Sequence, residues 1–107
     1  MFKHKDLNSF TVTIIEPSHF VHIEDIVIPP EYGKTRVGYH KVQWAKEYYQ
    51  RNGFMDKPIS VVPETNERGL PNKLCLVDEY SRYRAAIELG LTEVEVKYID
   101  INDYVIQ

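Results

Sequence analysis

Alternation of apolar and polar residues along the chain predicts a series of short, half-buried β-strands. Residues 10–14 and 93–99 alternate in this way, and 20–28 is rich in β-branched residues before two prolines end it. Two more strands are predicted at 58–62 and at 74–77, where the run is continuously apolar, as in a buried strand. The polar stretch from 63 to 73 is predicted to be a loop.

The first helical pattern covers residues 39–51. Val42, Ala45 and Tyr49 share one face of this segment, which is the face expected to pack on the core. Gly53 follows the pattern closely, and a glycine just past the last periodic residue is a common helix stop.

A second helix is predicted directly after the apolar strand at 74–77. Asp78 is a good N-cap residue, Gly90 is placed to end the helix, and Leu91 is placed to pack back on it. The apolar positions between them are Tyr83, Ala86, Ile87 and Leu89.

The order β-β-α-β-β-α-β predicts an α+β fold with a small mixed sheet and two main helices. We expect a single domain over residues 1–107, with 1–9 loosely held.

Composition restricts the binding partners and the cellular compartment that we expect for this domain. The chain has 107 residues, of which 43% are hydrophobic and 27% charged, and its net charge of −3 argues against nucleic-acid binding through bulk charge. One cysteine excludes an intramolecular disulfide and fits a reducing compartment. No apolar run approaches the ~20 residues of a membrane span, and the first residues do not resemble a signal peptide. We therefore expect a cytoplasmic protein without membrane association.

The junction between the apolar strand and the second helix is the main candidate site. Arg82 and Arg84 lie near the start of this helix, where free N–H groups and the helix dipole favour anions. A strand, a tight turn and a helix N-terminus with arginines form a candidate anion-binding site. The competing interpretation is that Asp78 only caps the helix and that both arginines lie on a solvated face.

The segment Leu-Val-Asp-Glu-Tyr-Ser-Arg-Tyr-Arg-Ala-Ala at 76–86 resembles the strand-to-helix motif of the ParB N-terminal/sulfiredoxin-like superfamily, whose name includes a ParB-like nuclease label. Arg36 is similar to the upstream arginine of that family, and 54–61 to its Pro-Ile-x-Val strand. The resemblance covers residues 20–99. It implies the family's fold and a phosphate- or nucleotide-binding site, which consists here of Asp78, Glu79, Tyr80, Ser81, Arg82 and Arg36.

Three positions of the motif depart from the family pattern. Glu79 stands where relatives commonly have glycine, and it adds a Cβ and a negative charge beside the phosphate position. Tyr80 and Ser81 stand where sulfiredoxins have the reactive cysteine and a histidine, so sulfiredoxin chemistry is not expected. The same two residues depart from the Gly-Glu-Arg-Arg box of ParB proteins. The resemblance therefore implies a weakened or repurposed phosphate site.

Two classes of function remain open at this stage. In the first, the domain binds a nucleotide or phosphate group at 78–84 and hydrolyses or transfers it, with Asp78 or Glu79 holding Mg²⁺ or acting as the base. In the second, it is a non-catalytic module that binds DNA or protein in plasmid, phage or DNA-maintenance functions. The sequence leaves the oligomeric state and enzyme activity undecided.

Several other side chains could react or bind a ligand, and each has a structural interpretation as well. Cys75 is predicted to be buried and inert. His19 and His22 would point to opposite faces of a strand, so no metal site is expected. The basic residues of 34–51 form either a rim facing phosphate or the solvated face of a helix. The eight tyrosines either wall the core or stack on bases.

Overall fold

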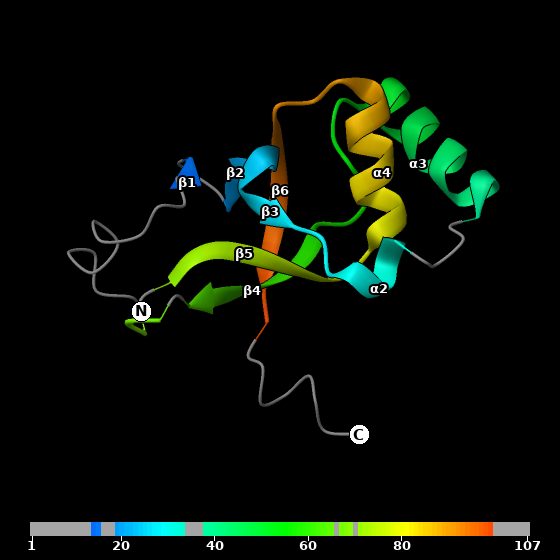
Figure 1. Ribbon diagram of the computed structural model, residues 1–107. Helices are drawn as coiled ribbons and strands as arrows, with labels where there is room; N and C mark the ends of the chain where they lie inside the picture. The colour runs from blue at the N-terminus through cyan, green and yellow to red at the C-terminus, as the bar shows by residue number, and fades with distance from the viewer. Residues whose placement is uncertain (1–13, 16–18, 34–37, 66, 70, 100–107) are drawn as a thin grey trace.

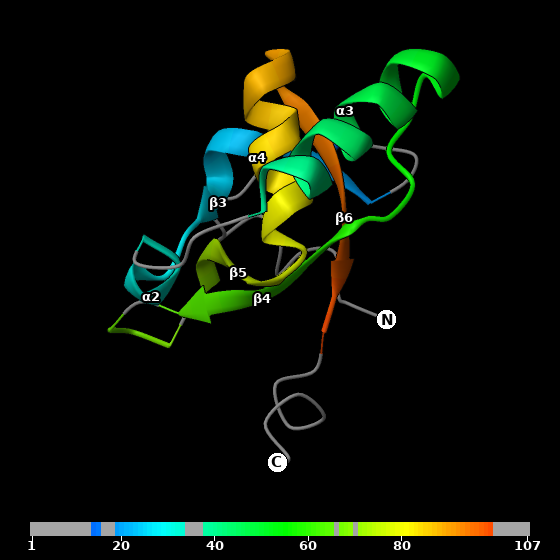
Figure 2. The same ribbon diagram turned by 90° about the vertical axis from the view of Figure 1, so that its right-hand side faces the viewer.

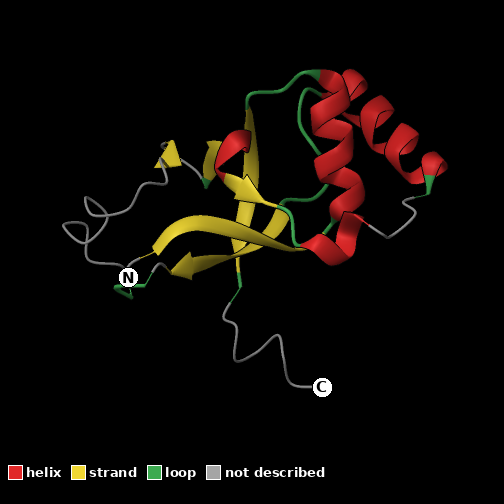
Figure 3. Cartoon of the chain, in the orientation of Figure 1, coloured by secondary structure: helices red, strands yellow, loops and turns green. Residues whose placement is uncertain are grey.

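The computed structural model describes residues 14–15, 19–33, 38–65, 67–69 and 71–99 (Figures 1 and 3). The strands are β1 (Ile14–Ile15), β2 (Phe20–His22), β3 (Ile26–Val27), β4 (Ile59–Thr65), β5 (Pro71–Asp78) and β6 (Glu93–Tyr98). The helices are α2 (Pro30–Gly33), α3 (Tyr39–Asn52) and α4 (Tyr80–Leu89), with a 3₁₀ turn, η1, at Ile23–Asp25. The predicted α+β class, with a mixed sheet and two main helices, is confirmed.

The strands form one mixed sheet in the order β1-β2-β6-β4-β5-β3. β4 pairs antiparallel with β5 and parallel with β6, so the centre of the sheet combines both kinds of pairing. Helices α3 and α4 lie together on one side of the sheet (Figures 1 and 2). Of the described helices, none is long and apolar enough to cross a membrane.

Helix α4 lies between the sheet and α3. Ala86 of α4 belongs to the main core, whereas Ala85 packs with Val42 and Ala45 of α3 in a second cluster. Small side chains at this contact allow the two helices to approach closely. The other members of the main core come from the sheet and its η1–β3 edge: Val21, Ile26, Ile59, Val61, Leu74, Leu76, Val94 and Val96.

The segments that begin and end α4 behave as the sequence predicts. β5 buries Leu74 and Leu76, and β6 buries Val94 and Val96 in alternation with exposed glutamates. Gly90 ends α4 in the left-handed conformation, and the N–H of Leu91 donates to the carbonyl of Ala86 at 3.0 Å. This strand-turn-helix unit is therefore anchored at both ends.

Three sequence predictions need correction. Residues 63–73 are not a loop, because β4 and β5 continue into this stretch as a hairpin that pairs Glu64 with Lys73. The exposed side chains of this part lack the apolar pattern that reveals a buried strand. The segment 20–28 is divided by η1 into two strands, and residues 29–38, predicted from the sequence to be a loop, include the short helix α2. Of the strand predicted at 10–14, residues 10–13 lie outside the described residues, and residue 14 belongs to β1.

Cys75 is half-buried rather than fully buried, since successive side chains of a strand alternate between the two faces of the sheet. Its neighbours Leu74 and Leu76 are the ones that point into the core. Partial burial, with Glu64 and Glu31 nearby, raises the pKa of the Cys75 thiol. The thiol is therefore protonated at neutral pH.

We expect Cys75 to react slowly with a thiol reagent in the folded protein, because the thiolate is the reactive form. Intact-mass measurement after brief treatment should show little modification. The same treatment in denaturant should give one complete adduct, which serves as the control. Rapid stoichiometric labelling of the native protein would contradict the raised pKa and the partial burial.

Candidate functional site

The turn between β5 and α4 consists of a single residue, Glu79. Its backbone is left-handed, with φ 68° and ψ 44°. The carbonyl of Glu79 accepts hydrogen bonds from the N–H groups of Arg82 at 3.0 Å and Tyr83 at 3.2 Å, so Glu79 is the N-cap of α4. The prediction that Asp78 caps the helix is wrong. Its carboxylate instead accepts a hydrogen bond from the N–H of Glu79 at 2.8 Å.

Glu79 is the one described non-glycine residue with a positive φ. A Cβ disfavours this conformation by about 1–2 kcal/mol, whereas glycine adopts it freely. The geometry of the turn thus gives a physical reason for a glycine at this position of the motif.

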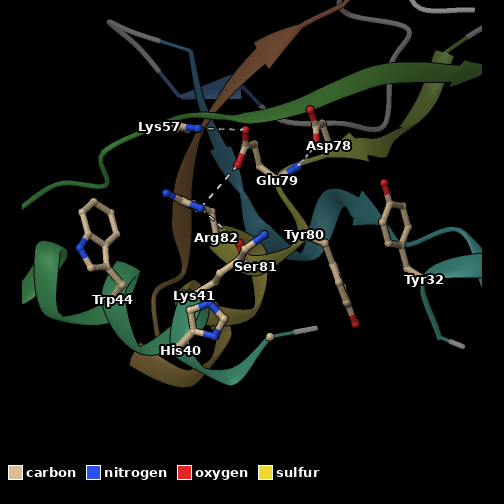
Figure 4. Close-up of a pocket in the computed structure, with 11 residues that line it drawn as sticks. Tyr32, His40, Lys41, Trp44, Lys57, Asp78, Glu79, Tyr80, Ser81 and Arg82 are labelled. Atoms are coloured by element: carbon tan, nitrogen blue, oxygen red, sulfur yellow. Dashed lines mark hydrogen bonds and ion pairs between the residues drawn. The ribbon is translucent and has the colours of Figure 1, made fainter. Parts of the chain in front are cut away.

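The turn opens on a hollow of about 770 Å³ (Figure 4). The walls come from α2, from the start of α3, from the segment before β4 and from the turn itself. The lining residues are Tyr32, Gly38, His40, Lys41, Trp44, Lys57, Asp78, Glu79, Tyr80, Ser81 and Arg82. The predicted site residues of the turn therefore lie together around one concave surface.

Arg82 is held at the side of the hollow by Asp56. Its Nε and Nη2 donate to the two carboxylate oxygens of Asp56 at 3.1 and 2.6 Å, and the side chains are only 12% and 13% exposed. This bidentate pair lowers the pKa of Asp56 and raises that of Arg82. Nη1 of Arg82 also donates to Ser81 Oγ at 3.3 Å. Much of the arginine charge is thus neutralised within the protein.

The cations that face the hollow more freely are lysines. Lys57 is 55% exposed and lies 3.8 Å from a carboxylate oxygen of Glu79, a loose ion pair. Lys41 is exposed and has no ion-pair partner among the described residues. The first N–H groups of α4, those of Tyr80 and Ser81, have no acceptor within the helix. These donors and charges surround the same space (Figure 4).

Tyrosines form the wall on the side of α2. The hydroxyl of Tyr32 donates to the carbonyl of Val77 at 3.0 Å. The ring of Tyr80 lies 5.0 Å from that of Tyr32 and 6.2 Å from that of Tyr83, measured between ring centroids. Tyr32 and Tyr83, the two rings beside Tyr80, also pack against the main core. These rings therefore serve mainly as walls, one of the two roles considered from the sequence.

The structure brings some predicted site residues together and adds others. Arg36, the remaining predicted site residue, lies outside the described residues. Sequence reasoning missed Asp56 and Lys57, although both belong to the segment 54–61 that carries the family resemblance. For Trp44, the helical pattern predicts only a position beside the face of α3 that packs on the core. Their roles depend on contacts with Glu79 and Arg82, which lie 22 or more positions further along the chain.

Comparison with known proteins identifies the fold. No family model and no curated protein matches the sequence. Among solved structures, sulfiredoxin from Arabidopsis thaliana is 22% identical with a TM-score of 0.58, over 74% of this chain and 80% of that one. The C-terminally truncated chromosome-partitioning protein ParB from Caulobacter crescentus, complexed to the centromeric parS site, is 21% identical with a TM-score of 0.62, over 80% of this chain.

Two further complexes match with similar scores. The same ParB protein complexed with CTP-gamma-S is 22% identical with a TM-score of 0.56, and covers 86% of this chain. Free serine kinase in complex with AMP is 12% identical with a TM-score of 0.59. The chain spans 42% of the parS-bound ParB chain and 35% of the kinase. The molecule thus has a ParB/sulfiredoxin-like fold, as the sequence resemblance predicts.

Proposed function

We propose that the domain binds a nucleotide or another phosphate-bearing ligand in the hollow at the β5–α4 turn. The observation that carries this proposal is the convergence of the α4 N-terminus with Lys41 and Lys57 on one concave surface. Free N–H groups and the helix dipole favour an anion there, and the lysines add positive charge. Structures with this fold in complex with CTP-gamma-S and AMP support the same ligand class.

Arg82 has a different role in this proposal from the one that the resemblance implies. Because Asp56 holds its guanidinium, a phosphate would have to compete for it with a short, bidentate ion pair. The N–H groups of Tyr80 and Ser81 and the two lysines are the more accessible partners. In this proposal, Arg82 fixes the start of α4. The part of its positive charge that Asp56 does not neutralise attracts the phosphate from a distance.

Asp78 and Glu79 make a magnesium-assisted form of binding chemically reasonable. Mg²⁺ in nucleotide sites is usually held by one or two carboxylates together with the phosphates. Both carboxylates border the hollow, so they would hold the ion, and the ion would offset the charge of Glu79. If the bound nucleotide is hydrolysed or its phosphoryl group transferred, the same two side chains are the candidate bases.

A thermal-shift screen of nucleotides and inorganic phosphate, with and without Mg²⁺, tests the proposal. A ligand present at 100 times its dissociation constant adds about 2.7 kcal/mol to the free energy of unfolding. Lys41→Ala should reduce this stabilisation, because Lys41 faces the hollow. Lys46→Ala is the matched control, since Lys46 lies on the same helix but pairs with Glu88 at 3.0 Å.

The screen also separates the two classes of function. Stabilisation by nucleotides that Lys41→Ala weakens would support the proposed site. No stabilisation by any nucleotide or phosphate, together with salt-sensitive binding of DNA, would instead support the non-catalytic module.

A further inference from the structure

Trp44 is a large aromatic side chain that borders the hollow and remains open to solvent. It is 47% exposed, although tryptophan is highly buried on average in folded proteins. It lies on α3 one turn beyond His40 and Lys41, on the side of the hollow across from Tyr32 (Figure 4). The charges that would attract a phosphate therefore lie beside an exposed aromatic surface.

The indole ring of Trp44 is held in place by its neighbours. The guanidinium carbon of Arg82 lies 5.6 Å from the ring centroid, within the range of a cation–π contact. On α3 itself, the ring of Tyr48 packs against Trp44 at 5.4 Å, and Phe54 packs against Tyr48 at 6.0 Å. Because Asp56 fixes Arg82, the ring is oriented before any ligand arrives. Such preorganisation lowers the entropic cost of binding.

Tyr80 and Tyr32 are the two tyrosines that line the hollow, and they are less available than Trp44. Their rings contact each other, Tyr80 also stacks on Tyr83, and the Tyr32 hydroxyl is bonded to the backbone. A base could enter between them only by displacing these contacts. The Trp44 ring also has contacts, with Arg82 and Tyr48, but Trp44 remains 47% exposed, so a base reaches the open part of the indole beside these contacts.

We propose that Trp44 is the stacking surface for a nucleobase, so that the ligand of this hollow is a nucleotide rather than a simple phosphate. The inference rests on the proposed phosphate site at the α4 N-terminus. The phosphate lies by Ser81 and Lys41, and the base lies on the exposed part of the indole ring. Stacking on an aromatic side chain is tolerant of base identity. The site therefore selects for the presence of a base more strongly than for its type.

The chain contains one tryptophan, so its fluorescence reports directly on this contact. The full chain is titrated with inorganic phosphate, ribose 5-phosphate, adenosine and AMP, with free tryptophan as the correction for absorbed light. AMP should quench the emission and bind roughly five-fold or more tighter than ribose 5-phosphate, as base stacking predicts. Ribose 5-phosphate should raise the thermal stability and leave the emission nearly unchanged.

Two variants link the effect to Trp44. Trp44→Leu keeps an apolar side chain but removes the ring, and it should reduce AMP affinity to that of ribose 5-phosphate in calorimetry. Tyr39→Leu is the matched control, because Tyr39 lies on the same helix and is 71% exposed but does not line the hollow. It should leave AMP affinity unchanged. Since Trp44 and Tyr39 are both exposed, neither variant is expected to unfold.

The outcomes separate this inference from the proposed function. Equal binding of AMP and ribose 5-phosphate without quenching would overturn the role of Trp44 and leave the phosphate site standing. Failure of all four ligands to bind would overturn both. If Trp44→Leu altered the oligomeric state and left AMP affinity intact, the exposed ring would be an interface between copies, which also overturns the inference.

Discussion

Replacing Asp56 by alanine should lower the free energy of unfolding by about 2 kcal/mol. The substitution leaves the Arg82 guanidinium, 12% exposed, without its bidentate partner. Removing one member of a fully buried pair costs about 3–5 kcal/mol, and the partial exposure here reduces that cost. Denaturant unfolding of the two proteins measures the difference directly.

The ion pair between α3 and α4 provides the control. Lys46 of α3 and Glu88 of α4 are 3.0 Å apart, but their side chains are 23% and 33% exposed. Lys46→Met keeps the aliphatic stem and should cost less than about 0.5 kcal/mol, as expected for a solvated pair. Equal losses for Asp56→Ala and Lys46→Met would show that Arg82 does not depend on Asp56 at this position.

The dependence of stability on pH gives a second measurement of the same pair. Folding lowers the pKa of Asp56 below its ordinary value of 3.8, chiefly through the hydrogen bonds from Arg82. Its contribution is therefore complete above that value and is lost as the pH falls through the lower, folded-state pKa. The Asp56→Asn variant should lack this part of the acid-induced loss. Identical acid profiles for the two proteins would contradict the assignment.

Replacing Glu79 by glycine should tighten phosphate or nucleotide binding about five-fold in the absence of magnesium. The substitution removes a carboxylate beside the expected phosphate position and a Cβ that limits its approach to the backbone. Loss of the repulsion is worth roughly 1 kcal/mol at an effective dielectric near 20 with screening. Calorimetry with AMP or inorganic phosphate detects a change of this size.

Glu79→Ala separates the effect of charge from that of backbone strain. Both variants lose the carboxylate, so both should bind the anion more tightly. Only glycine relieves the left-handed conformation at φ 68°, so Glu79→Gly should be about 1 kcal/mol more stable than Glu79→Ala. Equal stabilities would show that the turn changes its backbone when the side chain is shortened.

Magnesium reverses the expected result if Glu79 is one of its ligands. In that case Glu79→Gly should weaken the binding of the Mg²⁺-nucleotide complex while still strengthening binding of the free phosphate. If neither substitution changes the binding of any anion, the turn acts only as the start of α4 and the proposed function is wrong.

Much of the fold could be predicted because the pattern of apolar and polar residues within a short segment shows which side chains are buried. Val94 and Val96 alternate with glutamates, and Gly53 and Gly90 mark two helix ends, so these elements follow from neighbouring residues alone. The hairpin from 63 to 73 could not be predicted in this way. The side chains described in it are exposed, and its strands are defined by backbone hydrogen bonds that carry no apolar pattern.

The sequence by itself determined the strand-turn-helix unit and located the candidate site at residues 78–82. Only the tertiary structure decided what these residues do there. It paired Arg82 with Asp56, placed Glu79 in a left-handed turn, and brought Trp44 and Lys57 to the same hollow. Periodicity records which side chains are buried, whereas the partner of a charge depends on how distant segments pack. That packing neutralises much of the charge of Arg82, the arginine that the motif offers to an anion.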